Sequence, residues 1–138
     1  MVKEEEKLGL HKDTSLDVFA KRVSKNRNDL MLLIKELLAQ GKTIAIVSTP
    51  AKGMTLLNYC GITNRHVLFA TEKTKLKIGR FTPGGHIPIV PDSELLLHQP
   101  DFALLLAWNF SKEIMANLKE YSDKGGKFII PIPEPKII

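Results

Sequence analysis

The sequence predicts an α/β, Rossmann-like domain: a truncated doubly wound, mainly parallel sheet of four or five strands with an N-terminal amphipathic helix. Short, continuously apolar runs alternate with segments of helical periodicity, which is typical of parallel strands buried on both faces. The 138 residues, 43% hydrophobic and 25% charged, suffice for one packed core. We therefore expect a single domain over 14–138, preceded by a polar linker or frayed N-terminus over 1–13.

Helices are expected from capping residues and apolar spacing. The first begins at Thr14 or Ser15 and stops before Gly41. Its apolar residues recur every three or four positions, and they are Leu16, Phe19, Val23, Leu30, Leu33, Ile34, Leu37 and Leu38. Further helices are expected over 54–59, over a short segment ending at 98, and over 111–122. The inward face of the last would present Ile114, Met115, Leu118 and Tyr121.

Strands are expected where apolar and β-branched residues run together. Such runs occupy 43–48, 66–71, 102–108 and 127–130. A fifth extended segment contains Pro88, whose missing N–H places it at a sheet edge or makes it irregular. The tail 131–138 holds three prolines and is expected to be extended.

Several classes of site and location are excluded or disfavoured by composition. The single cysteine, Cys60, excludes an internal disulfide and a cysteine-based zinc site made by this chain alone. The histidines show no metal-ligand spacing, and the longest apolar run is too short to span a membrane. We therefore expect no metal site and no membrane association, and the cytoplasm is the expected compartment.

Positive charge is concentrated in the middle of the chain. Between positions 41 and 90, seven Lys or Arg residues face one acid, Glu72, in a chain of net charge +5. This bias suggests an anionic partner, although a merely solvated face is an equal alternative. A phosphate-bearing small molecule fits. A nucleic acid is disfavoured, because the basic stretch lacks a repeated aromatic–basic pattern.

The turn after the first strand is the first candidate ligand site. In an open parallel sheet, ligands bind beyond the carboxyl ends of the strands, where free N–H groups of helix N-termini gather. Glu72, nineteen residues beyond the turn, stands where an acid binds a ribose hydroxyl in dinucleotide folds. Neither glycine-rich phosphate motif is present, so plain turn chemistry is the alternative. The turn consists of Ser48, Thr49, Pro50, Ala51, Lys52 and Gly53.

Two further groups could close over the same crevice. In the loop after the second strand, Lys77 and Arg80 could bind phosphate and His86 could donate a hydrogen bond to it. The alternative is a glycine-rich connection with a surface histidine. Trp108 and Asn109 follow the fourth strand and would line the crevice, or else serve as a core residue and a helix cap. No catalytic residue is expected, because His86 lacks a partner nucleophile.

Four stretches resemble the C-terminal domain of the SAM-dependent sugar C-methyltransferases. They read TPAKGMTLLNYCGI, KIGRFTPGGHIPIV, PDFALLLAWNFSKEIM and GGKFIIPIPEP, and they occur in order at natural spacing. The family pattern usually has glycine where Ser48 stands and aspartate where Glu72 stands. The positions that match the recurrent motifs are Pro50, Ala51, Lys52, Gly53, Asn58, Lys77, Gly79, Arg80, Pro83, Gly84, His86, Trp108 and Asn109.

The resemblance implies a binding module rather than a complete enzyme. In that family, SAM and zinc are held by two other domains, so this chain is expected to bind neither by itself. The implied role is to bind a nucleotide-sugar and to complete an active-site cleft, either as an excised domain or together with a separate methyltransferase core. A stand-alone scaffold or subunit, or a small nucleotide-binding protein without catalysis, is the alternative.

Overall fold

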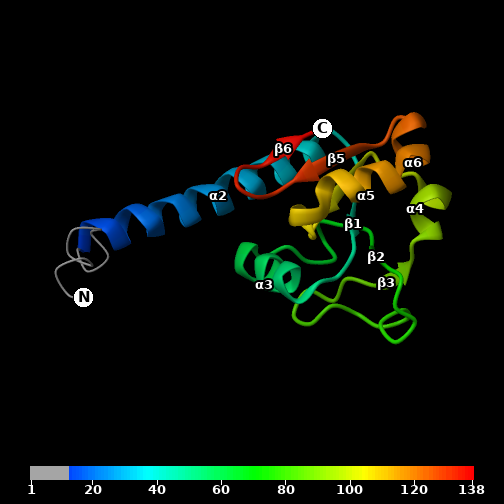
Figure 1. Ribbon diagram of the computed structural model, residues 1–138, viewed down its shortest axis with the longest axis horizontal. Coiled ribbons are helices and arrows are strands. Elements are labelled where there is room, and N and C mark those ends of the chain that lie inside the picture. Colours follow the sequence, from blue (N-terminus) through cyan, green and yellow to red (C-terminus); the bar gives the residue numbers. More distant parts are fainter. Residues whose placement is uncertain (1–12) are drawn as a thin grey trace.

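The computed structural model describes residues 13–138, with side chains from residue 16 onward (Figure 1). The predicted N-terminal linker thus lies outside the described residues, except for Asp13, where the first described helix begins. The helices are α2 (Asp13–Ala39), α3 (Ala51–Cys60), α4 (Ser93–His98), the 3-10 turn η1 (Trp108–Phe110), α5 (Ser111–Asn117) and α6 (Lys119–Asp123). The strands are β1 (Ile44–Val47), β2 (Ala70–Glu72), β3 (Ile89–Pro91), β4 (Phe102–Leu105), β5 (Lys127–Ile130) and β6 (Lys136–Ile137).

These strands form one sheet of six in the order β3-β2-β1-β4-β5-β6. All neighbours are parallel except β5 and β6, which pair antiparallel. The Rossmann-like, mainly parallel prediction is confirmed. Because β2 and β3 extend the sheet on one side of β1 and β4 and β5 on the other, strand order reverses between β1 and β4. The predicted edge position of the Pro88 segment is confirmed by β3.

Several element boundaries differ from the prediction. β6 was expected only as extended chain, and the sheet has six strands rather than four or five. β4 ends at Leu105, since its partner β1 ends opposite it at Val47 and leaves the sheet. β2 begins four residues later than the predicted strand. The last predicted helix is split at Leu118, whose φ of −105° and ψ of 28° are not helical.

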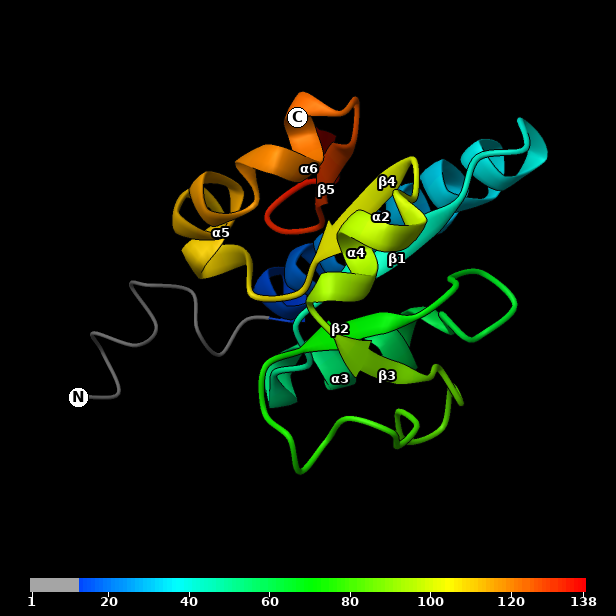
Figure 2. The ribbon, with the colours of Figure 1, turned by 90° about the vertical axis from the view of Figure 1, so that its right-hand side faces the viewer.

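The sheet is covered on both faces. On one face, α2 and α3 pack against β1, β4 and β5 through Leu30, Ile34 and Leu57. On the other face, Leu95 of α4 and Tyr121 of α6 pack against alternate residues of the same strands. The four residues predicted for the inward side of the last helix all belong to this second layer, despite the break. Figure 2 shows α4 in front of the strands and α2 and α3 behind them.

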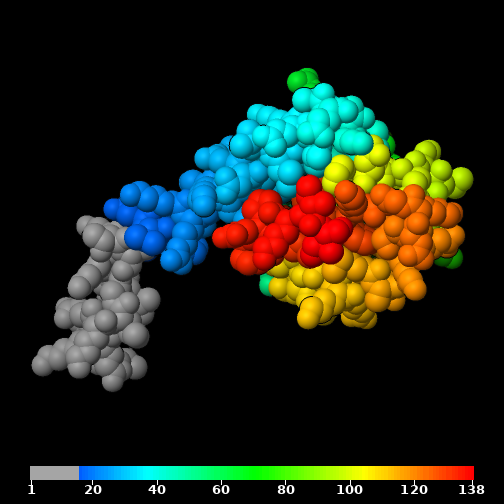
Figure 3. Space-filling view, turned by 90° about the horizontal axis from the view of Figure 1, so that it is seen from above, coloured from blue at the N-terminus to red at the C-terminus, as the bar shows by residue number. Residues whose placement is uncertain are grey.

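α2 has a buried half and an exposed half. Its apolar stripe continues through the whole helix, but the buried residues begin at Leu30. Toward the N-terminus, Leu16 is 60% exposed and Phe19 is 67% exposed. Between the two halves, Asn26 Nδ2 donates hydrogen bonds to the carbonyl oxygens of Pro131 and Pro133, at 3.0 and 2.9 Å. Figure 3 shows the first turns of α2 projecting from the body of the domain.

Candidate functional site

The turn after β1 has a backbone that suits glycine. Ser48 has a φ of 71°, in the left-handed region that side chains with a Cβ rarely adopt. Its side chain is half-buried at the carboxyl end of β1. The family resemblance places glycine at this position, and the backbone angle supplies the physical reason for that preference.

The next residue of the turn is bound to the end of β2. Thr49 is buried, its hydroxyl contacts Glu72 Oε2, and its N–H donates to the same oxygen at 3.3 Å. Glu72 Oε1 accepts from the N–H groups of Lys73 and Thr74, at 2.9 and 3.3 Å. Lys77 Nζ donates to Thr49 O at 3.0 Å and lies 3.8 Å from Glu72 Oε2. The network therefore fastens the turn to the connection that follows β2.

These contacts determine the charge state of Glu72. Burial by itself would raise the pKa of the carboxyl group, but the hydrogen bonds from Thr49, Lys73 and Thr74 and the charge of Lys77 hold the pKa below its ordinary value. Each carboxylate oxygen already has two partners from within the chain. Glu72 thus acts on the turn itself, which leaves no free acceptor for a ribose hydroxyl at this position.

Gly53 allows α3 to approach the end of β4 closely. A Cβ on Gly53 would lie 2.7 Å from the Cβ of Leu106, which is itself fully buried. Gly53, which we expected in a ligand-binding turn, therefore allows the helix to pack closely against the strand. Such packing is also the role of a glycine in the first turn of dinucleotide-binding folds.

Three predicted site residues lie at the opposite end of the sheet. α3 returns from the carboxyl end of β1 toward the amino end of β2, so Asn58, in its last turn, is remote from the Ser48 turn. A Cβ on Gly84 would lie 2.8 Å from Asn58 Oδ1. The ring of His86 packs against Phe81, with 5.8 Å between the ring centroids. These residues form a separate group around the C-terminus of α3.

The remaining predicted residues border the carboxyl edge or the sheet edge. Lys52 is exposed in the first turn of α3, while Trp108 is half-buried and Asn109 exposed in η1. Arg80 is exposed beside β3, where its carbonyl oxygen accepts from Ile89 N at 2.8 Å. None of these four side chains lines the cavity found in the described part of the molecule at the carboxyl edge.

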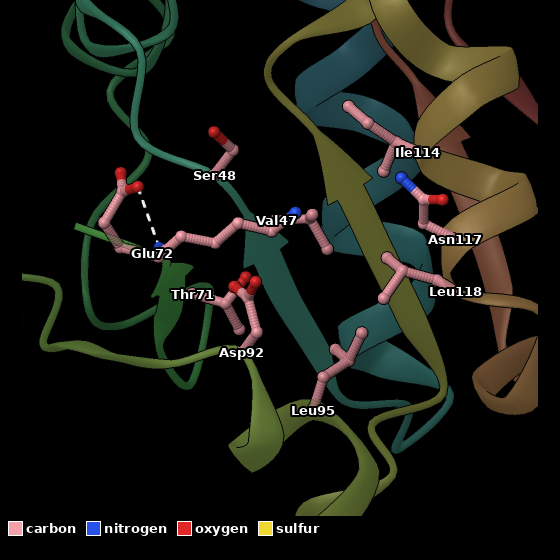
Figure 4. Close-up of a pocket in the computed structure, with 10 residues that line it drawn as sticks. Val47, Ser48, Thr71, Glu72, Asp92, Leu95, Ile114, Asn117 and Leu118 are labelled. Atoms are coloured by element: carbon pink, nitrogen blue, oxygen red, sulfur yellow. Dashed lines mark hydrogen bonds between the residues drawn. The ribbon is translucent and has the colours of Figure 1, made fainter.

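That cavity has a volume of about 180 Å³ and opens beside the Ser48 turn. Figure 4 shows Val47 at its centre, with Ser48, Glu72, Thr71 and Asp92 on one side and α5 on the other. Its apolar lining consists of Val47, Leu95, Ile114 and Leu118. Its polar lining consists of Ser48, Thr71, Glu72, Lys73, Asp92 and Asn117. It lies at the reversal of strand order, on the α4 and α5 face of the sheet.

Sequence reasoning identified Ser48 and Glu72 in this lining but missed Thr71, Lys73, Asp92 and Asn117. Thr71 and Lys73 flank Glu72 at the end of β2, and Asp92 directly follows β3. The signal was available, because the carboxyl ends of parallel strands meet at one edge and every polar residue there is a candidate. Asn117 carries no such signal, since it reaches the cavity only through the packing of α5.

The described residues offer little support for a cysteine nucleophile, a metal site or a membrane span. Cys60 is buried in the core, and burial raises the pKa of its thiol, with the charge of Arg27 opposing that effect. Within the described residues, no three His, Cys, Asp or Glu side chains gather as a metal site would require. Over the same part of the chain, no helix is both long and apolar enough to cross a membrane.

Comparison with known proteins agrees with the resemblance seen in the four sequence stretches. Residues 1–133 match a family model described as the C-methyltransferase C-terminal domain. Over all 138 residues the chain is 40% identical to the C-methyltransferase NovU of Streptomyces niveus. It corresponds to the C-terminal part of NovU and spans 33% of that protein's length. The chain therefore belongs to the family of C-methyltransferase C-terminal domains.

Proposed function

We propose that this chain is the ligand-binding module of a C-methyltransferase, which binds a nucleotide-linked sugar or a similar phosphate-bearing small molecule. The observation that supports this most is the cavity at the reversal of strand order, where open α/β sheets bind their ligands. In this proposal the module completes an active-site cleft whose catalytic groups belong to parts of the enzyme that this chain does not represent.

The surroundings of the cavity suit an anionic group. The N-terminus of α3 points to the carboxyl edge, and its cap, Pro50, makes no side-chain hydrogen bond to the free N–H groups of the first turn. Lys52 and Lys73 are exposed at the same edge, and neither forms an ion pair within residues 16–138. A phosphate could therefore be bound by backbone N–H groups and two ammonium groups.

SAM and zinc, which the resemblance implies for the complete enzymes, do not fit the residues of this chain. The carboxylate of Glu72 is already fully engaged with Thr49 and the backbone after β2, so it cannot bind the ribose of a SAM molecule. The single cysteine is buried in the core. We propose neither group as a cofactor of this chain and assign no catalytic step to its residues.

Isothermal titration calorimetry of the full chain would test the proposal. The panel is a set of nucleoside diphosphates and their hexose conjugates. We expect at least one conjugate to bind, with an affinity that falls several-fold in Lys52→Ala. Lys42→Ala is the matched control, because Lys42 is also exposed but precedes β1 at the opposite end of the sheet. Absence of binding across the whole panel would overturn the proposal.

A second candidate function, as a subunit that docks on a methyltransferase core, is favoured by the exposed half of α2. Leu16, Phe19 and Val23 form an apolar stripe with no partner among the described residues. The proposed occupant is the portion of a C-methyltransferase that lies outside the third of NovU matched by this chain. That portion of the enzyme would need an apolar groove that covers Leu16, Phe19 and Val23.

Co-purification with a C-methyltransferase fragment that lacks its C-terminal third would test this docking. We expect a complex that Phe19→Ser weakens at least tenfold. Lys21→Ser, on the opposite side of the helix, should leave the complex intact. If both variants bind like the natural chain, the stripe is not the docking surface.

A further inference from the structure

We propose that α5 is a movable wall of the cavity, which swings about its two ends and so controls access to the buried residues beneath it. The inference goes beyond the proposed function, because it concerns how the cavity opens and holds whatever the cavity binds. Three features of the helix support it: its packing, the geometry of its ends, and the space on its inner side.

α5 packs only loosely against the rest of the domain. Among the α-helices described within residues 13–138, it is the one without a buried side chain. Its inward residues Ile114 and Met115 are only half-buried. In the same part of the chain, no hydrogen bond joins α5 to the sheet or to α4, and no ion pair described from residue 16 onward includes a residue of α5. A helix held in this way has a low free energy of local opening.

The chain on either side of α5 is firmly anchored. Before the helix, Leu106 follows β4 and is fully buried. After the helix, Tyr121 of α6 is also fully buried, and its hydroxyl donates to Pro100 O at 2.7 Å. The loosely packed helix therefore lies between two fixed points, which is the arrangement of a hinged segment.

Both ends of α5 have backbone angles outside the helical region. Phe110, before the helix, has a φ of −110° and a ψ of 21°, and Leu118, after it, has a φ of −105° and a ψ of 28°. The side chain of Phe110 cannot cap the free N–H groups of the first turn. The end of α3 is different, because Gly61 N donates to the carbonyl oxygens of Asn58 and Leu57. A rotation at Phe110 would therefore break no side-chain cap, so this residue suits a hinge.

The cavity gives α5 room to move. Ile114 and Leu118 line it on the α5 side, and Thr71 and Leu95 line it on the side of the sheet and α4. Figure 4 shows these two walls facing each other across the space, whose volume is about 180 Å³. Because protein interiors are otherwise close-packed, an inward movement of α5 would gain apolar contacts. An outward movement would expose Thr71, which is 1% exposed in this arrangement.

Hydrogen exchange of the full chain would test the mobility of α5. We expect the amides of 115–118 to be protected roughly tenfold less than those of 56–59 in α3, because α5 opens while the rest of the domain stays folded. Equal protection of the two helices would overturn the inference.

The reaction of a cysteine placed under α5 would test its role as a wall. In Thr71→Cys, the new thiol is too deeply buried to meet fluorescein maleimide unless α5 moves outward. We expect this thiol to react roughly tenfold faster than Cys60, which is similarly buried but belongs to the well-anchored helix α3. Peptide mapping separates the two thiols. A new thiol that reacts as slowly as Cys60 would also overturn the inference.

Two variants in the Thr71→Cys background make this test specific to α5. Met115→Ala removes packing from the helix without changing the lining of the cavity, to which Met115 does not belong. It should raise the reaction rate several-fold. Glu113→Ala, on the exposed side of the same helix, should leave the rate unchanged, with thermal unfolding measured to confirm that both variants fold. Equal rates in the two variants would contradict the proposed movement. The proposed function is tested separately, because neither experiment contains a ligand.

Discussion

The Ser48–Gly53 turn and the cavity beside it share the carboxyl edge of the sheet, but their polar groups differ in how they are used. In the turn, Thr49 is bonded to Glu72 and Lys77, and Gly53 is in close contact with Leu106. In the cavity, no described hydrogen bond involves the Thr71 hydroxyl, and Asp92 makes no side-chain capping bond to α4. The turn is thus built mainly for stability, and the groups left to bind a ligand are those of the cavity together with Lys52 and the free N–H groups at the start of α3.

The close contact of Gly53 gives the largest expected effect. Gly53→Ala places a Cβ 2.7 Å from that of Leu106 and should lower the free energy of unfolding by about 2–3 kcal/mol. Urea denaturation would measure the change. In a Leu106→Gly background the same substitution should be nearly neutral, because the Cβ that it would meet has been removed. An equal loss of stability in both backgrounds would show that the added Cβ does not clash with the side chain of Leu106.

Thr49 and Thr71 provide the most direct comparison, because both are buried threonines one strand apart. Thr49→Val should lower the free energy of unfolding by about 2 kcal/mol, since Glu72 Oε2 loses its buried hydroxyl donor and keeps only the longer bond from the backbone N–H. Thr71→Val should be neutral or slightly stabilising, because Thr71 is buried and no described hydrogen bond involves its hydroxyl. Thermal and urea unfolding of both variants would measure this. Equal losses of stability in the two variants would contradict the structural role of Thr49 in the turn and the absence of one for the Thr71 hydroxyl.

Glu72 should make the stability of the turn depend on pH. Its folded-state pKa is lowered, so its contribution is present above the ordinary value of 4.5 and is lost as pH falls through the lower, folded value. Glu72→Gln should therefore lose about 1 kcal/mol at pH 7 and much less in strong acid. Urea unfolding at both pH values would measure it. A deficit that does not shrink with acid would contradict the charged role of Glu72.

Ser48→Gly should change stability less than the destabilising substitutions above. Ser48→Gly relieves the positive φ of 71° but adds flexibility to the unfolded chain, so we expect a net gain of about 0.5 kcal/mol. Ser48→Val, with a β-branched side chain at the same angle, should instead lose more than about 1 kcal/mol. Thermal unfolding would measure both. A stabilising valine would show that the backbone angle is not a source of strain.

The strands and their order of appearance were predictable because buried parallel strands have continuous apolar sequences. β1 and β5 match the prediction within one residue at each end. β6 was missed, because two residues that pair only once β5 is folded have no periodic pattern of their own. The stripe of α2 was found, but periodicity cannot tell which part of a stripe has a partner, and only the part from Leu30 onward is buried.

The candidate site was predictable only where it depends on local turn chemistry. Ser48 and Glu72 were found because they end neighbouring strands. Asp92 and Asn117 come from elements that meet only after folding, so no local motif contains them together. Asn58 and His86 were grouped with the turn because they belong to recurrent motifs, but Asn58 ends α3 at the other end of the sheet and His86 lies near it, in the loop of Gly84.

The two hydrogen bonds of Asn26 have a mechanical consequence for the exposed half of α2. Leu16 is ten residues from Asn26 along a continuous helix, which corresponds to about 15 Å. A tilt of about 20° at the Asn26 contact would therefore move the tip of the helix by about 5 Å. The two hydrogen bonds of Asn26 to the 131–133 segment therefore help the packed half of α2 to fix the direction in which the apolar stripe points.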